Sequence, residues 1–365
     1  MTTRKQDRVA QREVRVPIKV RRPRAAMPDL FSDPFGEQVA PLVYGPVQVL
    51  GARIQFESNS AELLSLVDSA YAAVPSHRLP GSVPQLRVRL IKISGQSGPR
   101  SSQPPPLTTF SGAGFLGGAT SSSDFVAVCP QDRAALVVVS PRMLRSAYHT
   151  RYELIEFAVY TLTARTQGLV SLHAACVGHA GRGVLLMGPS GSGKSTVALH
   201  SLLQGFDFLA EDSVLLHRNA LLATGIANFL HLRADSLRWF TRARDATQVR
   251  RSPIIQRRSG VKKFEWDLRH NDYRMAQTPL KIAATLFLSA QRDGERPRLR
   301  ALSKAQLLAK LTDLQPYAAN QPDWKKCCAS LSSVPVFELG RGRHPLDTVE
   351  VLREILGSPQ AHRAL

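Results

Sequence analysis

The residues best suited to chemistry lie at positions 188–196, where the sequence reads GPSGSGKST. Gly188, Gly193, Lys194 and Ser195 fit the pattern G-x-x-x-x-G-K-[S/T]. Glycines let a short loop turn so that its backbone N–H groups converge on phosphate oxygens, and a helix that begins at the lysine adds the positive end of its dipole. The lysine supplies charge between the β- and γ-phosphates, and the serine offers a hydroxyl to Mg²⁺. The stretch therefore predicts a phosphate-binding loop for a nucleotide.

The surroundings of this loop support the interpretation. An apolar segment of strand length, residues 183–188, comes before it, and a segment with leucines at helical spacing and a terminal Gly205 follows. We expect ATP and Mg²⁺ as the cofactors. The residues expected to contact the nucleotide are Gly188, Ser190, Gly191, Ser192, Gly193, Lys194, Ser195 and Thr196.

Two carboxylates follow the loop at a short interval. Glu211 and Asp212 end the strand-like segment 206–212, and only one helix separates that segment from the loop. We expect this strand to lie beside the strand that precedes the loop, so that its carboxyl end faces the phosphates and the metal. Upstream, His173 falls in the expected strand 172–178. Each residue has a structural alternative: the carboxylates could form a solvated strand end, and the histidine could be buried.

The loop sequence also occurs in transporter-type ATPases, which need an LSGGQ-like signature and a following strand that ends in Asp-Glu. The nearest match, 302-LSKAQ-306, lacks both glycines, and no such strand follows it. We therefore exclude that class.

The order of histidine, loop and acidic pair over residues 173–212 resembles the HPr kinase/phosphorylase family and its relatives, the HPr-kinase-like serine kinases. The resemblance implies an α/β phosphate-loop kinase core, related to bacterial phosphoenolpyruvate carboxykinases. It also implies an enzyme that uses ATP and Mg²⁺ to phosphorylate a serine hydroxyl of a protein or peptide. The family forms oligomers, so it further implies a homo-oligomer.

The resemblance also assigns roles to individual residues. His173 matches the family histidine beside the phosphates. Glu211 matches the candidate base for the acceptor hydroxyl, and Asp212 matches the acid that joins Ser195 at the metal. The family pair is usually Asp-Asp, so Glu211 is one methylene longer. The Gly-rich signature of the bifunctional members is not found; residues 250–269 stand in its place with a basic sequence. The resemblance therefore does not extend to phosphorylase activity or to HPr as acceptor.

The chain carries a large excess of positive charge, with 48 Lys and Arg against 28 Asp and Glu and a formal net charge of +20. Such a charge favours anionic partners in general. Twelve of the cations fall between residues 233 and 274, against five acids, and we call this stretch the basic segment. It is either a solvated insertion or a lid that docks an acidic substrate. The candidate lid residues are Arg257, Arg258, Lys262 and Lys263.

Hydrophobic periodicity predicts an α/β fold with three parts. These are a basic, disordered arm (1–40), a smaller N-terminal α+β domain (41–166) and an ATP-binding kinase domain (167–365). Strands are expected at 44–58 (a hairpin), 86–93, 125–129, 134–140, 172–178, 183–188, 206–212, 281–288 and 334–339. Helices are expected at 61–74, 143–166 and 304–314, with another from about Leu346; the Gly-, Ser- and Pro-rich residues 95–123 are expected to form loops.

Other functions stay open at this point. A small-molecule kinase or a carboxykinase-like enzyme could use the same core, and so could a nucleotide-binding module without catalysis. No aromatic-basic motif or helix-turn-helix pattern supports nucleic acid as a partner. No apolar run reaches the length of a membrane span, no secretory signal is visible, and the four cysteines have no disulfide or zinc spacing. These features predict a cytoplasmic protein.

Overall fold

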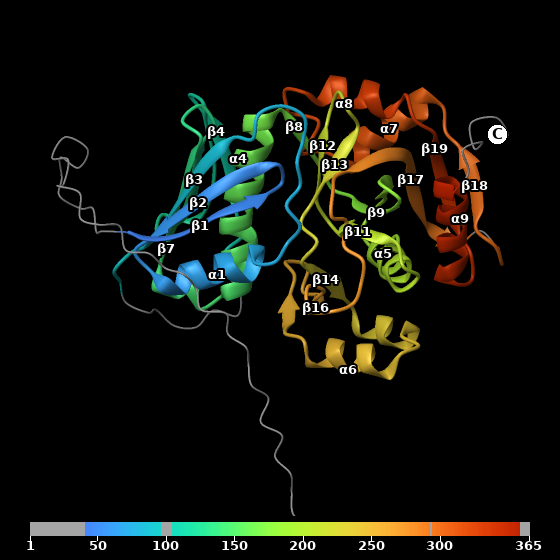
Figure 1. Ribbon diagram of the computed structural model, residues 1–365, viewed down its shortest axis with the longest axis horizontal. Coiled ribbons are helices and arrows are strands. Elements are labelled where there is room, and N and C mark those ends of the chain that lie inside the picture. The colour runs from blue at the N-terminus through green and yellow to red at the C-terminus, as the bar shows by residue number, and fades with distance from the viewer. Residues whose placement is uncertain (1–40, 96–103, 293, 358–365) are drawn as a thin grey trace, which may run out of the picture.

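The structure, a computed structural model, describes residues 41–95, 104–292 and 294–357 (Figure 1). The predicted basic arm, residues 1–40, lies outside these ranges. Figure 1 shows a sheet with two helices at the N-terminal side, a larger sheet flanked by helices at the C-terminal side, and a small sheet with α6 below and between them.

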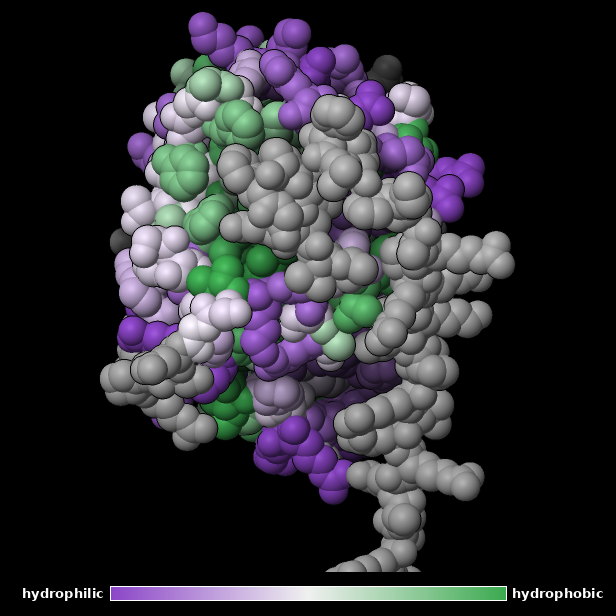
Figure 2. Space-filling model, turned by 90° about the vertical axis from the view of Figure 1, so that its left-hand side faces the viewer, coloured by the Kyte–Doolittle hydropathy of each residue, from purple (hydrophilic) through white to green (hydrophobic). Residues whose placement is uncertain are grey.

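Within the described residues, the first sheet has the strand order β1-β2-β3-β7-β6-β5-β4. Its strands are β1 Leu42–Val49, β2 Ala52–Ser58, β3 Gln85–Lys92, β4 Thr108–Gly112, β5 Phe115–Ser121, β6 Asp124–Cys129 and β7 Ala134–Val139. In β3, Leu86 and Val88 are buried while Gln85 and Arg87 are exposed, which confirms the predicted strand with one wet face. Figure 2 looks onto this side of the molecule and shows hydrophobic side chains in the middle of the face, with hydrophilic ones above and below.

The prediction of loops for residues 95–123 is wrong for β4 and β5. These strands pair with each other through the register Phe110↔Gly117 and Thr109↔Gly118. A side chain at Gly117 would collide with the Phe110 ring, at 2.4 Å from its Cζ atom. Gly117, one of the glycines that favoured a loop, therefore permits the close approach of a neighbouring ring to the strand.

Two helices cover the inner face of this sheet: α1 (Ala61–Tyr71) and α4 (Glu156–Gln167). The predicted single helix 143–166 is instead a broken segment that ends in α4. The pieces before α4 are α2 Pro141–Leu144, α3 Ala147–His149 and the π-helical η1 Thr150–Ile155. The Thr150 hydroxyl donates to the Met143 carbonyl at 2.7 Å, which satisfies the backbone at the break. Wide π turns of this kind are often found at functional sites.

The second sheet has the order β11-β9-β10-β17-β13-β12-β8 among the described strands, with β19 joined to β17 and β18 joined to β19. Its strands are β8 Leu169–Leu172, β9 Ala175–His179, β10 Arg182–Met187, β11 Asp207–Ala210, β12 Val214–His217, β13 Leu222–Thr224, β17 Leu280–Arg292, β18 Arg298–Ala301 and β19 Val336–Arg341.

Helices cover both faces of this sheet around β10. Val184 and Leu186 pack with α5 (Lys194–Leu203) and α9 (Pro345–Gly357), whereas Leu185 and Met187 pack with α7 (Lys304–Leu314) and α8 (Trp324–Leu331). A strand buried on both sides reads as a continuous apolar run, which is why residues 183–188 were recognisable in the sequence.

Two sequence predictions for this sheet need correction. The expected strand 172–178 is split: β8 pairs with β12, β9 pairs with β10 and β11, and His173 lies in the bend between them. The strand before the acidic pair, β11, does not lie beside β10, because β9 separates them. Because β11 pairs antiparallel with β9, and β9 pairs antiparallel with β10, β11 and β10 still run in the same direction and end at the same edge of the sheet.

The basic segment forms most of a small third sheet with the order β14-β16-β15. The strands of this sheet are β14 Phe229–Leu232, β15 Ile254–Gln256 and β16 Lys262–Asp267. The 3₁₀ helix η2 Ala234–Trp239 and the helix α6 Ala243–Arg251 lie between β14 and β15 in the sequence. Trp266 is buried at its centre. None of the helices in the part of the chain that the structure describes has the length and apolar character to traverse a bilayer.

Candidate active site

The glycine-rich loop, residues 188–193, joins the carboxyl end of β10 to the start of α5. Gly191 and Gly193 have φ angles of 80° and 98°, a left-handed conformation that other residues adopt only with strain. The loop therefore turns tightly, and the first turn of α5 directs its N–H groups toward the space that the loop encloses. In any helix these first amides have no acceptor within the helix, so they are available to an anion.

Lys194 lies under this loop and is buried. Its Nζ atom donates to the backbone carbonyl of Gly188 at 2.6 Å and lies 3.3 Å from the carbonyl oxygen of Pro189. Burial lowers the pKa of the ammonium, and the neighbouring charge of Asp212 partly opposes that shift. Within the described part of the chain, these hydrogen bonds of the ammonium go to neutral carbonyls, which charged phosphate oxygens can replace.

Glu211, directly after β11, reaches the loop from the other side. The hydroxyl of Ser195 donates to Glu211 Oε1 at 2.6 Å, while Oε2 accepts from the backbone N–H of His231 at 2.8 Å. The ammonium of Lys263 lies 3.7 Å from Oε1. Burial by itself raises the pKa of this carboxyl, but the charge and hydrogen bond of His231 and the charge of Lys263 outweigh it, so the pKa lies below its usual value.

His231 links Glu211 to a second carboxylate in the protein interior. Its ring atom Nδ1 lies 2.9 Å from Glu211, and Nε2 lies 3.2 Å from Glu265, which in turn binds the guanidinium of Arg151 through two contacts. Burial lowers the pKa of His231, yet the two carboxylates outweigh that effect and raise it. With both ring nitrogens facing carboxylates, the doubly protonated imidazolium fits the site.

Sequence reasoning missed His231, Glu265 and Arg151. The available signal was weak: a single charged or titratable residue within otherwise apolar stretches, as in 229-FLHL-232 and 264-FEW-266. Charged residues are seldom buried without a partner, so such positions indicate an internal ion pair. The sequence does not say with which residue.

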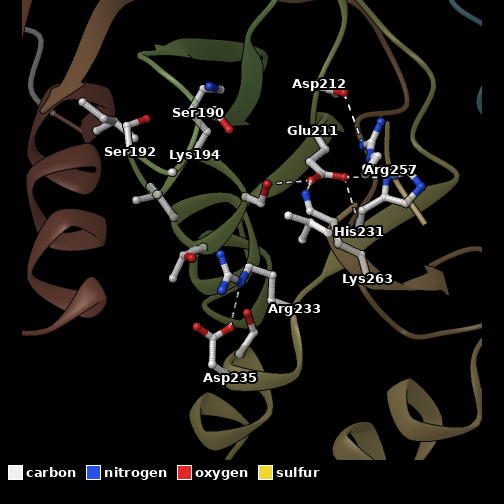
Figure 3. A pocket seen from close by; sticks show the side chains of 18 of the residues that line it. Ser190, Ser192, Lys194, Glu211, Asp212, His231, Arg233, Asp235, Arg257 and Lys263 are labelled. Atoms are coloured by element: carbon white, nitrogen blue, oxygen red, sulfur yellow. Dashed lines mark hydrogen bonds and ion pairs between the residues drawn. The ribbon is translucent and has the colours of Figure 1, made fainter. Parts of the chain in front are cut away.

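Asp212 points away from Glu211 toward the open space (Figure 3). Its carboxylate accepts from the Tyr152 hydroxyl at 3.0 Å, lies 3.0 Å from Nδ1 of His173, and lies 3.4 Å from Arg257 Nη2. Burial raises the pKa of Asp212, but the hydrogen bond from His173 and the charge of Arg257 hold it far below its ordinary range. Asp212 is therefore an ionised hydrogen-bond acceptor at the surface of the cavity.

The candidate lid residues divide into two groups. Arg257, Arg258 and Lys263 line the same cavity as the loop, whereas Lys262 is exposed and is not among the described residues that line it. Arg258 binds the carboxylate of Glu153 and the carbonyl groups of Pro104 and Pro105. These cations are already engaged with carboxylates and backbone, so they form a fixed wall of the cavity.

All of the predicted site residues except Gly188 and Lys262 line one cavity of ≈ 670 Å³. Figure 3 shows Glu211 between the loop on one side and the third sheet on the other; the labelled residues are Ser190, Ser192, Lys194, Glu211, Asp212, His231, Arg233, Asp235, Arg257 and Lys263. Tyr148, Tyr152 and Asp212 line the cavity, as do Trp239 and His344, whose ring centroids lie 4.7 Å apart in an edge-to-face arrangement.

The donor set fits Mg²⁺ bound together with phosphates. The described residues hold no group of three or more His, Cys, Asp or Glu side chains that could bind a metal ion by themselves. Mg²⁺ commonly takes only one or two protein oxygens and fills its octahedron with water and phosphate oxygens. The Ser195 hydroxyl and the ionised carboxylate of Glu211, 2.6 Å apart, form a pair of hard oxygen ligands of that kind.

Comparisons with known proteins give limited information. No family model matches the sequence, and no curated protein matches it. A solved structure of the HPr(Ser) kinase/phosphatase from Coxiella burnetii is 14% identical, and the match covers 50% of this chain and 94% of that chain with a TM-score of 0.23. This TM-score corresponds to a weak structural relationship only.

Proposed function

We propose that this protein is an ATP- and Mg²⁺-dependent kinase that transfers the γ-phosphate to a serine hydroxyl of a protein or peptide. The observation that supports the proposal best is the meeting of Lys194, Ser195, Glu211 and Asp212 in one cavity. A cation, a hydroxyl and two ionised carboxylates beside a glycine-rich loop are the parts that phosphoryl transfer needs.

On the nucleotide side, the loop amides and Lys194 bind the phosphates. Ser195 and Glu211 are proposed to hold the metal ion, because the Ser195 hydroxyl contacts Glu211 and not Asp212. This division reverses the one that the family resemblance implies. Held by Ser195 and Glu211, Mg²⁺ would supply positive charge against the charge that develops on the transferred phosphate.

On the acceptor side, Asp212 is proposed to accept a hydrogen bond from the serine hydroxyl and to orient it. The serine oxygen forms a bond to the γ-phosphorus while the bond from that phosphorus to the β–γ bridging oxygen breaks. The hydroxyl proton passes to Asp212 late in this step, which suits a carboxylate of low pKa and a loose transition state. His173 and Tyr152 hold the carboxylate in place, and Arg257 faces the same space.

The proposal is tested by incubation of the protein with γ-labelled ATP and a lysate of the source organism, followed by identification of the labelled species. We expect label on serine, which is stable to mild acid and lost in strong base. The Lys194→Ala variant serves as the control, and we expect it to bind ATP more weakly and to transfer no label. Unchanged ATP affinity and rate in this variant would contradict the proposal.

A further inference from the structure

Strand β15 has an open edge. It is the end strand of the third sheet, and among the described residues only β16 pairs with it. The amide of Glu265 donates to the carbonyl of Pro253, and the amide of Arg257 donates to the carbonyl of Val261. Residues 253, 255 and 257 therefore direct their backbone groups toward β16. Because alternate residues of a strand face opposite edges, Ile254 and Gln256 direct their N–H and C=O groups outward.

This open edge lines a groove. A second cavity, of ≈ 820 Å³, is lined by residues 254–256 of β15 together with residues from 93–95, 104–105, 120–124 and 140–149. Tyr148 and His149 line both this groove and the cavity of the glycine-rich loop. The two spaces are therefore neighbours, and β15 leads directly into Arg257, which lies 3.4 Å from Asp212.

The groove carries positive charge. Arg142 and Arg145 line its wall and are exposed. The acid that also lines it, Asp124, already accepts hydrogen bonds from the backbone N–H of Ser140 at 2.6 Å and from the hydroxyl of Ser121 at 2.8 Å. The carboxylate of Asp124 is thus engaged within the protein, whereas Arg142 is exposed at the groove. An acidic occupant fits this charge distribution.

The edge also carries an apolar side chain. Ile254, the first residue of the strand, is 64% exposed. An open edge with an exposed isoleucine invites pairing with another strand, and proteins usually protect such edges with charge or cover. A groove with an open edge, an apolar contact point and flanking cations matches an extended acidic peptide that adds as a strand.

We propose that the acceptor is an extended, acidic polypeptide segment that pairs with the open edge of β15 and carries its serine past Tyr148 and His149 to Asp212. This inference rests on the proposed kinase function, because it names the substrate of that site. Backbone hydrogen bonds to Ile254 and Gln256 hold the segment, and the exposed Arg142 selects its acidic side chains.

The test uses a fluorescein-labelled peptide of alternating Glu and Val with one central Ser, and its binding to the full chain is followed by fluorescence anisotropy. A series of peptides is prepared in which each backbone N–H in turn is methylated. Strand pairing predicts a period of two: methylation at alternate residues weakens binding about three- to tenfold, and methylation at the residues between leaves it unchanged. The peptides methylated at one set of alternate residues are the matched control for the peptides methylated at the other set. A flat response, or no binding of the peptide, would overturn the proposal.

A protein variant gives a second measurement. Gln256→Pro removes one outward N–H and no donor to β16, and proline is tolerated on an edge strand. We expect it to weaken peptide binding by a similar factor, with an unchanged unfolding temperature as the check on folding. Wild-type peptide affinity in this variant would contradict the inference.

Anisotropy and phosphate transfer separate the two proposals. Periodic binding without transfer from ATP would contradict the kinase function and leave the docking edge standing. Transfer to serine in other acceptors, with no periodic binding, would contradict the docking edge alone.

Discussion

Arg151 and Glu265 lie 114 residues apart in the sequence and form a buried ion pair with two contacts between guanidinium and carboxylate. Arg151 belongs to the π-helical turn η1 beside the first sheet, and Glu265 belongs to β16 of the third sheet. The guanidinium also donates to Glu156 at 3.1 Å. The pair therefore ties the N-terminal half of the molecule to the site.

This ion pair is the inner end of a continuous series of contacts. From Arg151 it passes through Glu265 and His231 to Glu211, and it ends at the Ser195 hydroxyl. All four of the charged or titratable side chains are buried. The position of the proposed metal-side carboxylate thus depends on a residue from the other half of the chain.

Removal of one partner of the ion pair is expected to destabilise the protein strongly. Arg151→Met removes the guanidinium that contacts both Glu265 and Glu156 and leaves His231 as the cation beside Glu265. Loss of one partner from a buried ion pair typically costs about 3–5 kcal/mol in the free energy of unfolding. The double variant Arg151→Met, Glu265→Leu removes both charges and is expected to recover part of that loss. Urea unfolding of the two single variants and the double variant measures the coupling. Additive losses would show that the pair contributes no coupling.

The two carboxylates of the acidic pair are expected to differ in kinetics. Glu211→Gln weakens the Ser195–carboxylate pair and should raise the Mg²⁺ concentration needed for half-maximal rate. Asp212→Asn keeps the shape but removes the acceptor charge, and should lower kcat about 100-fold with little change in Mg²⁺ dependence. A Mg²⁺ titration of the transfer rate measures both. The opposite result would restore the assignment that the family resemblance implies.

His231 gives an expected dependence of stability on pH. Its pKa in the folded protein is raised above the unfolded value of 6.5, chiefly by Glu211 against the opposing effect of burial. The imidazolium therefore stabilises the fold fully below pH 6.5, and this contribution is lost as pH rises through the folded pKa. In His231→Gln that loss should be absent. Urea unfolding between about pH 6 and 9 compares the two proteins, and parallel curves would contradict the prediction.

Two adjacent lysines provide a matched pair of variants. Lys263 lines the cavity and lies 3.7 Å from Glu211, whereas Lys262 is exposed outside it. Lys263→Met should lower the transfer rate about tenfold, because it removes a cation from the metal-side carboxylate and the phosphates. Lys262→Met should leave the rate within error. Equal effects would indicate that charge acts at long range, which a salt titration would then reveal through screening.

Segments whose structure depends on near neighbours can be predicted from the amino-acid sequence alone. The apolar strand before the glycine-rich loop and the helix after it follow from composition, because burial on both faces requires an uninterrupted apolar run. The helix α7 was predictable to the residue, since Ser303 and Gln306 form a capping box with each other.

Which of these segments meet depends on long-range packing. Local periodicity says that β11 is a strand, but strand order depends on pairings between distant residues, and here β9 lies between β11 and β10. For the same reason no local pattern joins Ser195 and Glu211 to His231, Glu265 and Arg151. These residues come from separate elements, and a charge in an apolar strand shows that a buried partner exists without showing where it is. The packing of the halves supplies that partner, because a buried charge is stable only where an opposite charge is brought against it.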